Sequence, residues 1–276
     1  EIVAHRIAYG RTRSIDKFED AMRDQAGVDV SNNSWGFLDR FSDNFDRSAL
    51  SGLSEAMRQA AETGRDGLGT SLVFSAGNKG YEGDNVNYHN MQNSEFGITV
   101  GAVDSNGWAA WYSTPGSAVL VSAEGVNVSS TDRSGSGGYG SGDITTVDGT
   151  SFAAPAVSGL VSRMYEVNAE LGYRDVQEIL AYSSKQSEVQ TWDWETTGAT
   201  DWNGGGLTFN NLFGFGIIDE HAALRLAESW SGQATYETRE TATVSRSPNG
   251  SVTAAPGGQD RDYASLTFDV SEEIDI

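Results

Sequence analysis

The stretch Asp148-Gly149-Thr150-Ser151-Phe152-Ala153-Ala154-Pro155 contains the strongest signal in this chain for both fold and chemistry. A short Gly-Thr-Ser turn leads into small and apolar residues, which predict a helix over residues 153–164. A serine at the N-terminus of a helix lies beside unpaired backbone N–H groups, which favour developing negative charge. Ser151 is therefore a candidate nucleophile. From the turn alone, the alternative that its hydroxyl only caps the helix stays open.

Strand-like and helix-like segments alternate on both sides of this stretch. Short apolar runs predict strands at residues 2–4, 28–30, 72–74, 96–103 and 118–121, and helical spacing of apolar residues predicts helices at residues 50–61, 176–180 and 220–230. Such alternation favours a mostly parallel sheet covered by helices on both faces. We therefore expect an α/β fold. From residue 233 the chain is rich in Thr, Ser and Gly and predicts a linker and the start of an all-β unit.

The composition excludes several classes of function. Of the 276 residues, 39 are acidic and 18 are basic, which gives a formal net charge of −21. Without a basic patch, nucleic acid is not an expected partner. No apolar run approaches the roughly 18 residues of a membrane span. Cysteine is absent, which excludes disulfides and cysteine zinc sites. The acidity indicates a solvated surface, with calcium binding as a second interpretation for part of it.

Two further motifs follow predicted strands. Ser75-Ala76-Gly77-Asn78 comes directly after the run at residues 72–74, and ligands gather at the carboxyl ends of strands in open α/β sheets. The Asn78 amide is a candidate donor to an oxyanion, although a turn asparagine is the alternative. Ser34-Trp35-Gly36 follows another strand and is a candidate for pairing with an extended peptide. A loop with a packed tryptophan is the alternative there.

The order of these three motifs resembles that of the subtilisin-like serine proteases, and more closely the kexin/furin-like proprotein convertase branch. Five other stretches share the resemblance to this branch: residues 66–69, 83–88, 111–113, 173–177 and 213–219. The resemblance implies a subtilisin-like three-layer α/β fold over residues 1–232. It also implies that residues 233–276 begin a P-domain-like β sandwich.

The same resemblance implies roles for individual residues. Ser151 would be the nucleophile, and Asn78 would stabilise the oxyanion together with the Ser151 backbone N–H. The substrate backbone and first side chain would contact residues from both sides of a cleft: Ser34, Trp35, Gly36, Asp39, Gly77, His89 and Thr150. A peptide or protein substrate is the expected partner.

Specificity and metal binding follow the branch only in part. Asp39 matches one acidic position near its specificity pocket, and Asp84 matches a calcium ligand. Asp39 and Asp84 are therefore candidates for a structural calcium site. However, His89 occupies the position of a pocket aspartate, and Thr114 that of a calcium-ligating glutamate. We therefore do not expect strict cleavage after paired basic residues.

The family's other two catalytic residues, an aspartate before Ser/Thr-Gly and a histidine before Gly-Thr, have no matching motif in this sequence. His5, His89 and His221 are not at the base position. We therefore expect the chain to be truncated at both ends and to have little or no peptidase activity alone, with a preceding segment or a propeptide as a partner. The alternatives are a catalytically inactive peptide-binding scaffold and an esterase, although no Gly-x-Ser-x-Gly motif is present. The resemblance implies a secreted or periplasmic location.

Overall fold

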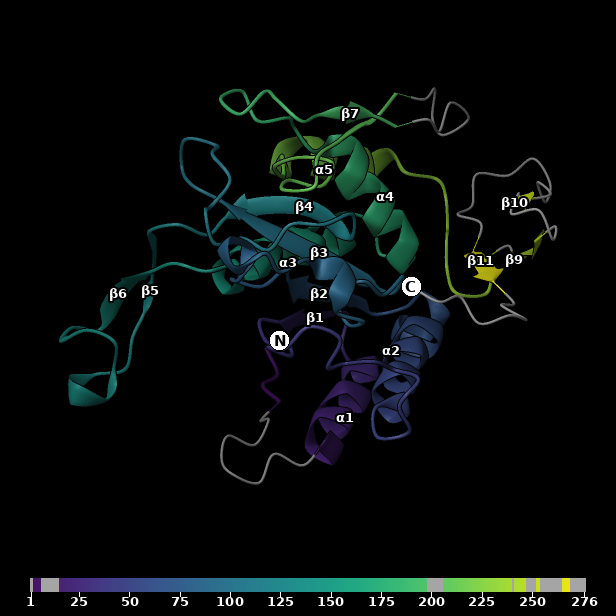
Figure 1. Ribbon diagram of the computed structural model, residues 1–276, viewed down its shortest axis with the longest axis horizontal. Helices are drawn as coiled ribbons and strands as arrows, with labels where there is room; N and C mark the ends of the chain where they lie inside the picture. Colours follow the sequence, from purple (N-terminus) through teal and green to yellow (C-terminus); the bar gives the residue numbers. More distant parts are fainter. Residues whose placement is uncertain are drawn as a thin grey trace.

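A computed structural model describes residues 2–5, 15–197, 206–239, 241–246, 252–253 and 265–268. Its centre is a parallel sheet of four strands in the order β1-β2-β3-β4. The strands are β1 (Val30–Asn33), β2 (Ser71–Ser75), β3 (Gly97–Val103) and β4 (Val119–Glu124). Leu72 pairs with Ser31 on one side and with Gly97 on the other. The expected parallel α/β sheet is therefore present (Figure 1).

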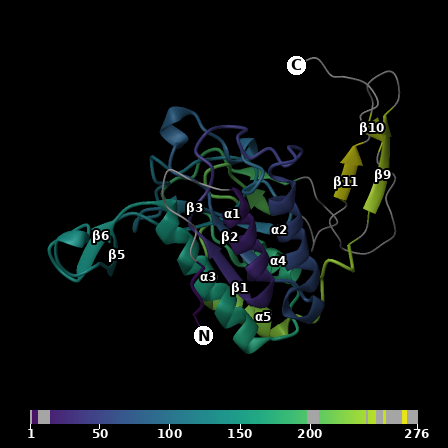
Figure 2. The ribbon, with the colours of Figure 1, turned by 90° about the horizontal axis from the view of Figure 1, so that it is seen from below.

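Helices cover both faces of this sheet. The α-helices are α1 (Ile15–Arg23), α2 (Ser51–Thr63), α3 (Thr150–Val167), α4 (Tyr173–Ser183) and α5 (Glu220–Ser229). Figure 2 shows α2 and α3 on opposite sides of β1 and β2. The three layers of the expected fold are therefore helix, sheet and helix.

Alternation along β2 explains why both faces need a helix. Successive side chains of a strand point to opposite faces. Leu72 and Phe74 pack with Met57 and other residues of α1 and α2, whereas Val73 packs with residues of α3 such as Val157. All five residues of β2 are buried, which agrees with the uninterrupted apolar run in the sequence.

Smaller elements complete the described chain. The short 3₁₀ helices are η1 (Asp24–Gly27), η2 (Gly64–Gly67), η3 (Gly80–Glu82), η4 (Val86–Tyr88) and η5 (Gly135–Gly137). Antiparallel pairs are formed by β5 (Val128–Thr131) with β6 (Ile144–Val147), and by β7 (Glu195–Thr196) with β8 (Thr208–Phe209). The β5–β6 hairpin stands out from the sheet and its helices (Figure 1).

Two expectations are corrected by the fold. The helix predicted at residues 153–164 is longer at both ends in the structure, where α3 spans Thr150–Val167. The strand predicted at residues 2–4 is absent from that described segment, where Ile2 is almost fully exposed and has no strand partner. In the described part of the chain, no helix has the length and apolarity needed to cross a membrane.

The expected β unit at residues 233–276 lies largely outside the described residues. The described part includes β9 (Thr241–Arg246), β10 (Val252–Thr253) and β11 (Ser265–Phe268), in the order β10-β9-β11. β10 is antiparallel to β9, and β11 is parallel to it. These strands are β structure, and their assignment to a P-domain stays a prediction.

Candidate active site

Ser151 lies inside the first turn of α3 and does not cap the helix. The N-cap residue is Gly149, with φ 150° and ψ 150°, and Thr150 is the first helical residue. Because Ser151 is the second helical residue, its backbone N–H is among the four that an α-helix leaves without an internal partner. The interpretation of Ser151 as a helix cap is therefore wrong. Within the described residues, no side chain forms a hydrogen bond with its hydroxyl.

Thr150 holds the Asn78 side chain in one orientation. The backbone N–H and the hydroxyl of Thr150 both donate to Asn78 Oδ1, each at 2.9 Å. The Thr150 hydroxyl also accepts the N–H of Gly77 at 3.1 Å. With its oxygen bound, Asn78 presents its Nδ2 amide as a donor. This nitrogen lies 3.5 Å from where a Cβ on Gly149 would be, next to the turn that carries Ser151.

Gly77 needs to be glycine for two reasons. Its φ of 103° lies in the left-handed region that side chains disfavour. A Cβ there would also lie 3.0 Å from Thr114 Oγ1. The Gly77 carbonyl accepts the Thr114 N–H at 3.0 Å, so the chain between β2 and Asn78 is bound on both sides.

Ser34 connects the end of β1 to α3. Its hydroxyl donates to the backbone carbonyl of Ser151 at 2.8 Å and accepts from Asn32 Nδ2 at 3.0 Å. Asn32 Oδ1 in turn accepts from the Ser158 hydroxyl, also at 3.0 Å. Ser34 therefore lies against the residue proposed as nucleophile, although the two are 117 positions apart in sequence.

A buried tyrosine supports the turn before Ser151. The Tyr112 hydroxyl donates to the Gly125 carbonyl at 2.6 Å, and the Gly149 N–H donates to the same oxygen at 2.8 Å. Burial raises the pKa of Tyr112 to about 12, so the hydroxyl stays protonated far into the alkaline range. A Cβ on Gly125 would lie 2.9 Å from the Gly149 carbonyl, so the close approach of the two segments requires glycine.

Of the two residues after Ser34, Trp35 has a packed side chain and Gly36 is exposed to solvent. The Trp35 ring packs on Phe18 of α1 with centroids 5.1 Å apart, and its indole N–H donates to Asn33 Oδ1 at 3.1 Å. The predicted substrate contacts of Trp35 and Gly36 stay predictions.

Gln92 lies between this segment and the end of β2. Its side-chain amide donates to the Ser75 carbonyl at 3.3 Å. The same nitrogen lies 2.8 Å from where a Cβ on Gly36 would be. Gln92 is 6% exposed, and its Oε1 has no hydrogen-bond partner within the described chain. One buried amide therefore contacts both sides of the predicted substrate cleft.

His89 is buried between two carboxylates. Its Nε2 lies 3.1 Å from Asp84 Oδ2, and its Nδ1 lies 3.7 Å from Asp43 Oδ1. The Asp43 carboxylate is the largest influence on the imidazole. Together with Asp84 it raises the pKa of His89 above its ordinary value, against the opposing effect of burial. These contacts favour an imidazolium ion, and a role of His89 in substrate binding stays a prediction.

Asp39 and Asp84 line one cavity of about 370 Å³, as expected if they share a site. Calcium requires about six to eight oxygen ligands. However, Asp84 already accepts from the Asn85 N–H and faces His89, and the side chains of Arg40 and Lys79 line the same cavity. Within the described residues, no group of three or more His, Cys, Asp or Glu side chains is placed to hold a metal. The residues present do not fit a calcium ion.

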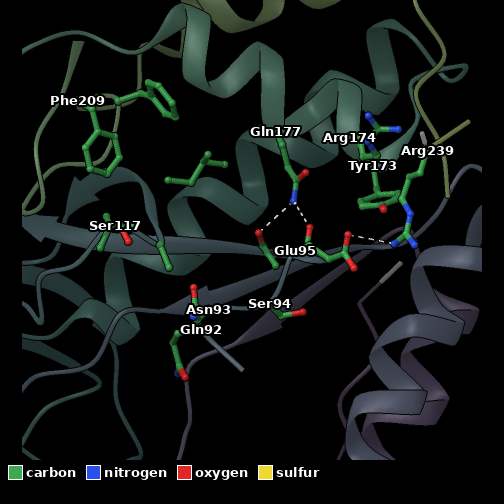
Figure 3. A pocket seen from close by; sticks show the side chains of 15 residues that line it. Gln92, Asn93, Ser94, Glu95, Ser117, Tyr173, Arg174, Gln177, Phe209 and Arg239 are labelled. Atoms are coloured by element: carbon green, nitrogen blue, oxygen red, sulfur yellow. Dashed lines mark hydrogen bonds and ion pairs between the residues drawn. The ribbon is translucent and has the colours of Figure 1, made fainter. Parts of the chain in front are cut away.

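A larger cavity, of about 620 Å³, lies at the opposite ends of the strands (Figure 3). It is lined by Gly97 and Val119, where β3 and β4 begin, and by the first turn of α4. The Gln177 amide donates to the carbonyls of Glu95 and Gly97, both at 3.1 Å. Gln92, which donates to the Ser75 carbonyl near the other end of β2, also lines this cavity.

Comparison with known proteins decides the family. Residues 8–216 match the model of the Subtilase family. The chain is a member of the subtilase family. It is 30% identical over 218 residues to a rat protein named proprotein convertase subtilisin/kexin type 6. This match covers 74% of this chain and 21% of the rat protein. It is 32% identical over 211 residues to kexin of Saccharomyces cerevisiae, covering 73% of this chain and 24% of kexin.

This subtilase chain thus spans about a fifth to a quarter of the length of these curated relatives. Among solved structures, the serine protease of Aeromonas sobria in complex with a chaperone superposes with a TM-score of 0.70 at 20% identity. That match covers 80% of this chain and 47% of the protease. At this identity the likeness shows the subtilase fold.

The sequence analysis did not predict several residues that border the candidate site. Gln92, Asp43, Arg40 and Lys79 were not expected to contribute, and each contacts or borders a residue that was. A signal existed for two of them, because Arg40 follows Asp39 and Lys79 follows Asn78. For Gln92 and Asp43 the sequence contained no signal, since their contacts depend on how separate loops meet.

Proposed function

We propose that this chain is the nucleophile-bearing part of a serine endopeptidase. The observation that supports this most directly is the pair of Thr150 hydrogen bonds to Asn78 Oδ1. They direct a side-chain amide donor toward the turn at Ser151, where the backbone N–H of the first helical turn supplies a second donor. Two such donors are what a tetrahedral oxyanion requires, and the adjacent Ser151 hydroxyl would be the nucleophile.

The reaction would follow the acyl-enzyme mechanism. Ser151 Oγ attacks the scissile carbonyl carbon while a histidine base takes its proton, and the oxyanion receives hydrogen bonds from Asn78 Nδ2 and the Ser151 N–H. The protonated base then gives its proton to the leaving amine. Water, activated by the same base, hydrolyses the ester on Ser151. The orientation of Asn78 by Thr150 is set before the substrate arrives, so little reorganisation is needed.

In this proposal, the catalytic histidine and aspartate lie outside residues 1–276. The sequence contains neither of the family's motifs for them, and His89 is buried between Asp84 and Asp43. The chain alone is therefore expected to have little or no peptidase activity. Contact with a preceding segment of the same protein would complete the site.

Labelling of Ser151 by a fluorophosphonate tests both the role of Ser151 as nucleophile and the inactivity of the chain alone. We expect negligible labelling of the chain alone, and rapid, stoichiometric labelling when it is produced together with an upstream segment of its gene that encodes the aspartate and histidine motifs. Ser151→Ala is the control in both cases. Rapid stoichiometric labelling of the chain alone would contradict its inactivity. An upstream gene sequence without those motifs would favour the second candidate, an inactive peptide-binding scaffold.

Further assignments belong to the same proposal. We infer a peptide or protein substrate, paired in extended form with the backbone of residues 34–36. We also infer a secreted or periplasmic protein whose residues 233–276 begin a P-domain-like unit. Cell fractionation of the native host with an antibody against this chain tests the location, and recovery only in the cytosol would contradict it.

A further inference from the structure

The cavity that contains Asp39 and Asp84 is lined by nearly balanced charges. Three carboxylates surround it, from Asp39, Glu82 and Asp84, together with the cations Arg40 and Lys79 and the apolar Leu38. Two segments meet there. Residues 38–40 follow the predicted substrate strand, and residues 79–84 follow Asn78.

Lys79 bridges these two segments. Its ammonium donates to the backbone carbonyl of Leu38 at 3.1 Å and lies 3.9 Å from the Glu82 carboxylate. Its own backbone N–H donates to Thr114 Oγ1 at 3.1 Å. The side chain therefore reaches across the cavity from the residue next to Asn78 to a residue two positions after Gly36.

Arg40 makes the reciprocal connection. Its Nη2 donates to the Glu82 carbonyl at 2.6 Å, and its Nε lies 3.6 Å from Asp84 Oδ1. Asp84 is 7% exposed, and an unpaired carboxylate at that depth is costly. Arg40 and His89 both lie beside this carboxylate. Arg40 is positively charged, and the raised pKa of His89 favours its charged form.

Oxygen atoms of the kinds that bind divalent ions are thus contacted by cations of the chain. These are the Leu38 carbonyl, the Glu82 carbonyl and the Asp84 carboxylate. One lysine and one arginine also supply two positive charges, the charge of one calcium ion. Arg prefers paired carboxylate and carbonyl acceptors because of its planar fork of donors. A metal ion placed in the cavity would meet the repulsion of both cations.

We propose that Lys79 and Arg40 replace a divalent cation between residues 38–40 and residues 79–84, so that this side of the substrate cleft is stabilised by the chain's own charges and does not depend on calcium. Residues 79–84 continue directly from Asn78. The Lys79 bridge therefore also fixes the separation between the oxyanion donor and the substrate strand.

Thermal unfolding of residues 1–276 tests the proposal without reference to activity. We expect the same Tm in millimolar CaCl₂, in MgCl₂ of the same ionic strength and in EDTA. A ligand present well above its Kd raises Tm by several degrees in a chain of this size. A calcium-specific rise in Tm that disappears in Asp84→Asn would overturn the proposal. Terbium luminescence sensitised by Tyr81, beside Glu82, gives a second readout, and Asp84-dependent binding of terbium at micromolar concentration would overturn it too.

The double variant Arg40→Gln/Lys79→Gln tests the role of the cations. At low ionic strength we expect its Tm to fall below that of the native chain, and calcium to restore part of the loss through Asp84. The matched control is Lys17→Gln/Arg163→Gln, which removes two exposed cations elsewhere and should leave Tm unchanged. A double variant with the Tm of the native chain, or one that calcium does not stabilise, would overturn the proposal that Lys79 and Arg40 replace a divalent cation. If the double variant does not fold, the single variant Lys79→Gln is measured in the same way.

Discussion

Asn78 Oδ1 accepts two hydrogen bonds from Thr150, one from the backbone N–H and one from the hydroxyl, each at 2.9 Å. The two residues are 72 positions apart in sequence. Asn78 follows the end of β2, and Thr150 begins α3. This contact therefore fixes the orientation of the Asn78 amide, the proposed oxyanion donor, relative to the helix that carries Ser151.

Replacing Asn78 should impair turnover and leave binding nearly unchanged. In the complete protease, Asn78→Ala should lower kcat about 10²–10³-fold, a range established with subtilisin, because one of two oxyanion donors is lost. KM should change little, since the donor acts on the transition state. Steady-state kinetics on a peptide substrate measure both constants. A rise in KM by the same factor, with kcat unchanged, would instead assign Asn78 to substrate binding.

Thr150 should act through Asn78. Thr150→Val removes the hydroxyl that contacts Asn78 and Gly77, whereas Thr150→Ser keeps it. We expect kcat of the valine variant to fall roughly tenfold, the value of about one net hydrogen bond. The serine variant should retain most of the activity. Comparison of Thr150→Val in the native and Asn78→Ala backgrounds shows coupling, and full additivity of the two losses would contradict the positioning role.

Gln92 should limit the size of the first substrate side chain. Its amide contacts both Ser75 and the site of a Cβ on Gly36. In the complete protease, Gln92→Ala should increase cleavage after large side chains in a peptide library. Gly36→Ala alone should be impaired by the close contact at 2.8 Å, and Gln92→Ala should relieve that impairment. A library profile unchanged by Gln92→Ala would contradict the assignment.

His89 should make the stability of the chain depend on pH. Its pKa is raised above 6.5 in the folded state by Asp43 and Asp84. The stabilising contribution is therefore fully present below the unfolded pKa and is lost as pH rises through the folded pKa. Between about pH 6 and pH 8, the free energy of unfolding should fall more in the native chain than in His89→Gln. Denaturation by urea across this range measures the difference. The control is His221→Gln, on the exposed start of α5, which should behave like the native chain.

Tyr165 should contribute to stability through one buried hydrogen bond. Its hydroxyl lies 2.6 Å from the Ser71 hydroxyl, and the Arg65 guanidinium lies over its ring at 3.4 Å from the centroid. Tyr165→Phe leaves the buried Ser71 hydroxyl without this partner and should cost about 1–3 kcal/mol of unfolding free energy. Tyr139→Phe, on a side chain that is 91% exposed, should change stability by less than about 0.5 kcal/mol. Equal effects of the two variants would contradict a specific role of the Ser71 contact.

Local pattern predicted most of the sheet and four of its covering helices, but it did not predict α1, and it placed the first strand at residues 28–30 where β1 spans Val30–Asn33. The apolar run at residues 72–74 lies in β2, and the spacing of Val176, Ile179 and Leu180 corresponds to the buried side of α4. Both follow from periodicity, because side-chain direction repeats every two residues in a strand and every 3.6 in a helix. The strand predicted at residues 2–4 was wrong because an apolar run needs a neighbouring strand to pair with, and the sequence alone does not supply one.

The sequence by itself determined which residue types were available for chemistry: a serine after Gly-Thr, an asparagine after a buried strand, and no cysteine. Only the tertiary structure decided that Ser151 does not cap its helix, that Thr150 orients Asn78, and that Gln92 lies against Gly36. It also brought Lys79 and Arg40 into the cavity of Asp39 and Asp84. The physical reason is that hydrogen bonds and ion pairs depend on distances of about 3–4 Å between side chains, and those distances are set by how loops far apart in the chain meet at one end of the sheet.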